Sequence, residues 1–193
     1  MDTKTHGQLY KRALLLEYLT IAWNVFEGIA AMAIGLTSGS VSLFAYGLES
    51  SVEVFSSSVT VWELRGAEKG RKKKALKMIG IAYLIVSAYI FIDAIKSLFE
   101  GHHAQQSPLG IIFLIITVIV MFTLGILKTD VGKKIKNVVV LADAKFSIID
   151  AALSGTVLIG LILNALFGWW WMDQALALFL AGVAFREGFK ELL

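Results

Sequence analysis

Long apolar stretches alternate with short polar ones along the whole chain. Six of these stretches are long enough to cross the hydrocarbon core of a bilayer, which takes about 20 apolar residues in a helix. They cover residues 13–35, 41–63, 76–98, 108–127, 138–162 and 170–188. The pattern therefore predicts an all-α polytopic membrane protein with six transmembrane helices, in which residues 1–193 form a single transmembrane domain.

The composition agrees with this prediction and excludes other classes. Hydrophobic residues make up 57% of the chain and charged residues only 17%, a balance that is unusual for a soluble domain. The net charge is +3, but the basic residues gather between the apolar stretches, so we expect a lipid bilayer and no nucleic acid as partner. The sequence has no cysteine and no P-loop, HExxH or Ser-His-Asp pattern, so we do not expect an enzyme.

Lysine and arginine are distributed unevenly among the segments that connect the apolar stretches. They gather in the N-terminal segment, after the second stretch and after the fourth: Lys4, Lys11 and Arg12; Arg65, Lys69, Arg71, Lys72, Lys73, Lys74 and Lys77; Lys128, Lys133, Lys134 and Lys136. Positively charged loops stay on the cytoplasmic side. We therefore expect both termini in the cytoplasm and the protein in the cell (inner) membrane.

Polar residues recur every three or four positions in three of the stretches, which places them on one face of each helix. The first, second and fifth stretches carry, in turn, Glu17, Thr20, Asn24 and Glu27; Tyr46, Glu49, Glu53, Ser56, Ser57 and Thr60; Asp143, Ser147, Asp150 and Ser154. Ionisable side chains are costly inside a membrane, and they mark ion or proton pathways. The three polar faces are expected to turn toward one another around a polar cavity.

Two carboxylates four residues apart on one helix repel each other unless a cation or a proton lies between them. Glu49 and Glu53, together with Asp150, predict a site for a divalent metal ion. Protons can replace the metal there, because a carboxylate binds metal only when it is deprotonated. Supporting polar contacts or a proton path are expected from Asn24, Glu27, Asp143, Ser147, Ser154 and Glu17. For Glu17 and Glu27 a structural hydrogen-bonding role is an equal alternative.

Four short motifs in order resemble the cation diffusion facilitator family over essentially the whole chain. They are Asn24 followed by "IGLTSGSVSLFAYG", the pair Glu49 and Glu53, "LADAKFSIIDAALS", and "GWWWMDQALALFLAGVAFREG". The resemblance implies a six-span homodimeric transporter that exports zinc or a similar divalent ion in exchange for protons. It supports the metal site at Glu49, Glu53 and Asp150, with no permanently bound cofactor.

The departures from the family pattern bear on the metal. Glutamates replace the two aspartates of the second span, Phe146 stands where the family has a histidine, and the cytoplasmic C-terminal domain of the family is not found. Dimerisation would then rest on the membrane spans. The family pattern favours zinc, whereas an oxygen-only ligand set suits manganese or ferrous iron.

Other features keep two readings open. Lys145 either extends to the lipid headgroups or pairs with a carboxylate. His102 and His103 lie in a non-cytoplasmic loop, where they either bind zinc weakly or have no metal-binding role, because adjacent histidines do not converge on a metal without further ligands. The alternative function is a membrane scaffold or regulatory homologue that kept the fold and lost transport.

Overall fold

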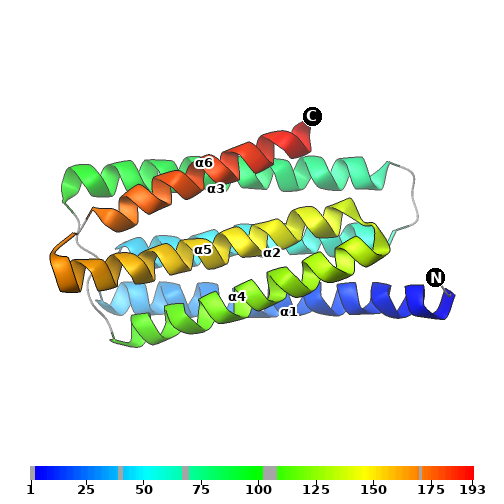
Figure 1. Ribbon diagram of the computed structural model, residues 1–193, viewed down its shortest axis with the longest axis horizontal. Coiled ribbons are helices and arrows are strands. Elements are labelled where there is room, and N and C mark those ends of the chain that lie inside the picture. Colours follow the sequence, from blue (N-terminus) through cyan, green and yellow to red (C-terminus); the bar gives the residue numbers. More distant parts are fainter. Residues whose placement is uncertain (1–2, 39–40, 67–69, 102–107, 170) are drawn as a thin grey trace.

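The computed structural model describes residues 3–38, 41–66, 70–101, 108–169 and 171–193. This part of the chain forms six α-helices and no strand: α1 (Thr3–Ser38), α2 (Val41–Leu64), α3 (Arg71–Glu100), α4 (Pro108–Ile135), α5 (Val138–Phe167) and α6 (Met172–Leu192). Consecutive helices run in opposite directions along one long axis (Figure 1). The all-α prediction is confirmed.

The helices extend beyond most of the predicted stretches. The first five contain their stretch and the sixth begins at Met172. Within the described residues, three segments are long and apolar enough to span a membrane: His6–Ile34, Arg71–Glu100 and Ile111–Ile135. The count of six spans stays a prediction.

The end of α4 differs from the predicted boundary. This helix continues to Ile135 and not to 127, so the assignment of Lys128 to a polar loop was wrong. The helix continues because no proline or other strong breaker follows Lys128, and because buried Val131 and Ile135 extend its apolar face.

The turn between α4 and α5 is fixed by its own residues. Lys136 adopts a left-handed conformation with φ of 53°, and Asn137 begins α5 as its N-cap. The Asn137 Oδ1 atom accepts hydrogen bonds from the backbone N–H groups of Val139 (2.8 Å) and Val140 (3.3 Å), which is the usual N-cap contact. Its Nδ2 donates to Glu63 Oε2 at 2.8 Å. This turn therefore ties α5 to the end of α2.

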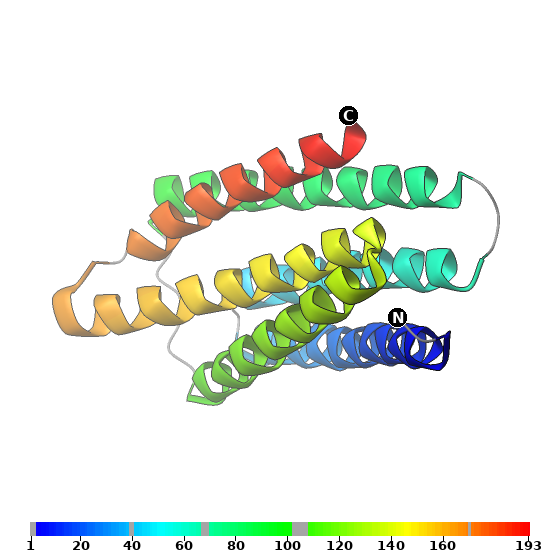
Figure 2. The same cartoon turned by 45° about the vertical axis from the view of Figure 1, so that its right-hand side comes forward.

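The six helices divide into two groups. Helices α1, α2, α4 and α5 form a bundle, and α3 packs with α6 along one side of it (Figures 1 and 2). The most extensive packing occurs between α1 and α2, between α4 and α5, and between α3 and α6. We call the first group the four-helix bundle and the second the α3–α6 pair.

Glycine allows two of these helix pairs to approach closely. A Cβ atom at Gly47 would lie 2.7 Å from the carbonyl oxygen of Gly28, where α1 crosses α2. A Cβ atom at Gly188 would lie 2.8 Å from the carbonyl oxygen of Gly80 and 2.7 Å from Tyr83 Cβ, where α3 crosses α6. Small residues at such crossings are typical of membrane helices, because they bring the backbones into contact.

The N terminus and the α4–α5 turn lie at the same end of the molecule, as do the end of α2 and the start of α3 (Figure 1). Basic residues such as Arg71 and Lys133 belong to this end. The arrangement agrees with the basic segments sharing one side of the membrane. That this side is cytoplasmic stays a prediction.

Candidate ion pathway in the four-helix bundle

The interior of the four-helix bundle is polar. Each helix contributes side chains that are at most 9% exposed: Glu17, Thr20, Asn24 and Glu27 from α1; Glu49, Glu53, Ser56, Ser57 and Thr60 from α2; Thr117 and Lys128 from α4; Asp143, Ser147, Asp150 and Ser154 from α5. All described members of the three predicted polar faces are thus buried. The side chain of Tyr46 lies outside the described residues, and the contribution of α4 was not predicted.

Glu53 is the predicted ligand that the structure connects most directly to a second helix. Its side chain is 1% exposed, and its Oε1 accepts a hydrogen bond from Ser147 Oγ of α5 at 2.6 Å. The polar faces of α2 and α5 therefore meet at this point. Its other oxygen, Oε2, is buried without a hydrogen bond, so it is an acceptor that is open to a cation or to a proton.

Glu49 and Asp150 are also buried, at 9% and 4% exposure. Within the described ranges, however, no three His, Cys, Asp or Glu side chains lie close enough together to hold a metal ion. The structure places the three predicted ligands inside the bundle without gathering them into one group. Their metal-binding role stays a prediction.

Asp143 lies at the centre of a buried polar cluster. Its carboxylate accepts hydrogen bonds from Ser56 Oγ, from Ser57 Oγ at 3.1 Å and from Lys128 Nζ at 2.6 Å. The donors come from α2 and α4, so Asp143 joins three helices. A buried carboxylate needs such partners, because desolvation of an unpaired charge costs several kcal/mol.

Glu17 brings α1 into the same cluster. Its Oε2 lies 3.6 Å from Lys128 Nζ, and both side chains are fully buried. We call Glu17, Ser56, Ser57, Lys128 and Asp143 the Lys128 cluster. It crosses all four helices of the bundle, which gives Glu17 and Asp143 partners that their sequence positions did not reveal.

Lys128 could have been found from the helical period of α4. Thr117, Met121 and Leu124 are buried on one face of this helix, and Lys128 follows at the next turn, with Val131 and Ile135 beyond it. Residues at these intervals share a face. A lysine between buried positions is a residue inside the bundle, although the positive charge suggested a loop.

Thr20 and Asn24 of α1 contact the backbone of their own helix. Thr20 donates to the carbonyl oxygen of Leu16, and Asn24 Nδ2 donates to the carbonyl oxygen of Thr20, each at 3.0 Å. Asn24 Nδ2 also lies 3.8 Å from Met121 Sδ of α4. Its Oδ1 is buried without a hydrogen bond, so Asn24 retains an acceptor for a supporting role.

Phe146 packs among apolar side chains. It is 3% exposed and belongs to the apolar cluster that α5 shares with α3 and α6. Its ring centroid lies 4.3 Å from that of Tyr83, whose hydroxyl donates to the carbonyl oxygen of Ala142 at 3.0 Å. In this chain the position of the family histidine is therefore a packing position.

The structure shows which of its two alternatives Lys145 adopts, extension to the lipid headgroups or pairing with a carboxylate. Its Nζ lies 2.7 Å from Glu187 Oε2 and 3.8 Å from Glu191 Oε1, so it pairs with carboxylates of α6. His102 and His103 lie outside the described residues.

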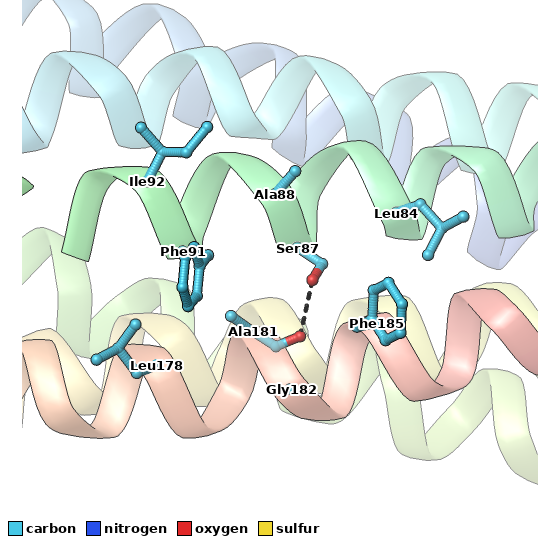
Figure 3. Close-up of a pocket in the computed structure, with 9 residues that line it drawn as sticks. All are labelled: Leu84, Ser87, Ala88, Phe91, Ile92, Leu178, Ala181, Gly182 and Phe185. Atoms are coloured by element: carbon cyan, nitrogen blue, oxygen red, sulfur yellow. Dashed lines mark hydrogen bonds between the residues drawn. The ribbon is translucent and has the colours of Figure 1, made fainter. Parts of the chain in front are cut away.

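A separate groove between α3 and α6 differs chemically from the bundle interior. It has a volume of about 500 Å³ and is lined mainly by apolar side chains, among them Leu84, Phe91, Leu178 and Phe185 (Figure 3). The hydroxyl of Ser87 faces it but donates to the carbonyl oxygen of Ala181 at 2.9 Å. Without an ionisable group in its lining, this groove is not a candidate ion site.

Three apolar helices of membrane-spanning length, packed with a buried acidic interior, are the features of an integral membrane protein. The family model of the cation efflux transmembrane domain matches residues 78–193, and the chain therefore belongs to the cation efflux family. This confirms the family resemblance found in the sequence motifs.

Relatives extend the similarity toward the N terminus. The chain is 28% identical over 160 residues to an uncharacterized transporter of Synechocystis, covering 77% of this chain and 51% of the relative. It is 23% identical over 190 residues to Transmembrane protein 163 of Xenopus laevis, covering 95% and 67%. It is 27% identical over 182 residues to an uncharacterized transporter of Methanocaldococcus jannaschii, covering 86% and 64%. The chain thus spans between about half and two thirds of the length of these relatives.

Proposed function

We propose that the protein exports a divalent metal cation from the cytoplasm in exchange for protons. The observation that carries the proposal is the meeting of two buried acidic faces, where Ser147 of α5 donates to Glu53 of α2. Membership of the cation efflux family supports it. Zinc is the first candidate, and manganese or ferrous iron are alternatives suited to oxygen ligands.

The proposed ligands are Glu49, Glu53 and Asp150. Each carboxylate either coordinates the metal or carries a proton, because protonation removes the negative charge that binds the cation. The bundle would open first to the cytoplasm, where metal binds, and then to the opposite side, where metal leaves and protons bind. This alternation of one site between two sides couples the two fluxes.

We also propose that the protein works as a homodimer whose contacts lie in the membrane spans, in the cell membrane. The proposal rests on the family resemblance. Chemical crosslinking in native membranes would detect the dimer.

Two observations favour a second candidate, a membrane scaffold or regulatory homologue that does not transport. Phe146 occupies an apolar packing position, and within the part of the chain that is described no three potential ligands converge. In this case the buried carboxylates would stay protonated and serve as hydrogen-bonding groups.

Reconstitution in liposomes separates the two candidates. An imposed proton gradient should drive zinc or manganese flux through the wild type, and Asp150→Asn should abolish that flux, because it removes a charged ligand. Asp130→Asn is the matched control, since Asp130 is a 46% exposed aspartate that pairs with Lys134 on α4, and its flux should equal that of the wild type. Equal leak through the wild type and Asp150→Asn would contradict the transport proposal.

A further inference from the structure

Lys128 is a fully buried cation in the same interior as the proposed metal site. Its Nζ contacts Asp143 Oδ2 at 2.6 Å and Glu17 Oε2 at 3.6 Å, and all three side chains are 0% exposed. A lysine in this environment is costly unless it is well paired. Two contacting carboxylates compensate its single positive charge.

The Lys128 cluster is continuous with Glu53. Asp143 and Ser147 lie one helical turn apart on α5 and so share a face. Asp143 binds Lys128, and Ser147 binds Glu53. The lysine and a metal held by Glu53 would therefore occupy one acidic interior and repel each other.

We propose that Lys128 is a tethered cation that competes with the transported metal for the acidic interior of the four-helix bundle. When no metal is bound, its ammonium group balances Asp143 and Glu17 and holds α1, α4 and α5 together. When a divalent ion arrives, the positive charge of Lys128 opposes it. Lys128 thus weakens metal binding and favours release. This inference rests on the proposed function, because it needs a metal that binds near Glu53.

The competition predicts a change of affinity that a purely structural lysine would not cause. Lys128→Met keeps an unbranched side chain that is one atom shorter and removes the charge. We expect it to bind zinc or manganese about tenfold more tightly than the wild type, because one repulsive charge is lost from a poorly screened interior. A lysine that only packs the helices would leave the affinity unchanged or reduced.

The test is a titration of the purified full chain in detergent with zinc or manganese. Isothermal titration calorimetry measures the binding affinity of each variant. Lys128→Arg keeps the charge and should stay within about twofold of the wild type. Lys134→Met is the matched control, since Lys134 is a 50% exposed lysine of the same helix, and its affinity should not change. The double variant Lys128→Met/Asp143→Asn loses one charge of each sign and should return close to the wild-type affinity.

The double variant also covers the case in which Lys128→Met alone does not fold. Asp143→Asn keeps the lysine and loses an attractive carboxylate, so the double variant should bind about tenfold more tightly than Asp143→Asn. If the wild type binds metal but Lys128→Met binds no more tightly than the wild type, or the double variant binds no more tightly than Asp143→Asn, the competition alone would be overturned. A wild type that binds none of the divalent ions tested would overturn the proposed function together with it.

Discussion

The four-helix bundle and the α3–α6 pair are two neighbouring assemblies that both contain a close glycine crossing, but among the described residues only the bundle also contains a fully buried ion pair. In the bundle, Lys128 and Asp143 form a fully buried ion pair that reaches α1 through Glu17. In the α3–α6 pair, Gly80 and Gly188 bring the backbones together beside an apolar groove. The difference indicates that charged groups pair inside the four-helix bundle, whereas close packing of the backbones joins α3 and α6.

The two assemblies should also respond differently to substitution. A buried ion pair is only modestly favourable as a whole, but removal of one partner leaves an uncompensated charge. A glycine crossing contains no charge to expose, and substitution there instead forces atoms apart. The free energy of unfolding of one variant from each assembly, each compared with a matched control, tests this difference.

The largest effect is expected from Asp143→Ala. The substitution removes the closest partner of Lys128 and the acceptor for Ser56 and Ser57. We expect the free energy of unfolding in mixed detergent micelles to fall by about 3–5 kcal/mol. Asp130→Ala, at an exposed pair with Lys134, should change it by less than about 0.5 kcal/mol. Similar losses in both variants would mean that the buried pair does not hold the bundle together.

A smaller effect is expected from Gly188→Leu in the α3–α6 pair. Its Cβ would meet Tyr83 Cβ at 2.7 Å and the carbonyl oxygen of Gly80 at 2.8 Å, so the two helices must separate. Overpacking of this kind costs about 1–3 kcal/mol. Gly182→Leu is the matched control, because a Cβ there meets no atom within 4 Å. The same unfolding measurement should show a clear loss for Gly188→Leu, whereas equal stability of the two variants would contradict close packing as the basis of the pair.

The sequence predicted features that depend on residues close together in the chain better than those that depend on distant residues. The six helices were predictable from six long apolar stretches, because an apolar stretch that crosses lipid must hydrogen-bond its backbone groups within a helix. The polar faces of α1, α2 and α5 were predictable from spacing alone. The end of α4 was not, because the positive charge of Lys128 outweighed the continuing apolar period at Val131 and Ile135.

The contacts between residues of different helices were harder to predict than the residues that share one face of a helix. Lys128 and Asp143 are 15 residues apart and meet only because the turn at Asn137 folds α5 back along α4. Spacing within one helix cannot specify which helix faces it, so Glu17, Asp143 and Lys128 could not be joined beforehand. The substitution of Phe146 for histidine was visible in the sequence, but its packing against Tyr83 depends on α3.

The smallest effect is expected where a charged pair links the two assemblies. Lys145 of α5 contacts Glu187 of α6 at 2.7 Å, but its side chain is 47% exposed. Water and salt screen such a pair, so Lys145→Met should lower the free energy of unfolding by at most about 1 kcal/mol. That small loss should shrink further at about 1 M salt, where the screening length is about 3 Å. The loss in Asp143→Ala should persist in the same salt series, because its ion pair is fully buried. If the loss in Lys145→Met were as large as that in Asp143→Ala and equally insensitive to salt, the link would be as desolvated as the bundle interior, and the division into two kinds of contact would fail.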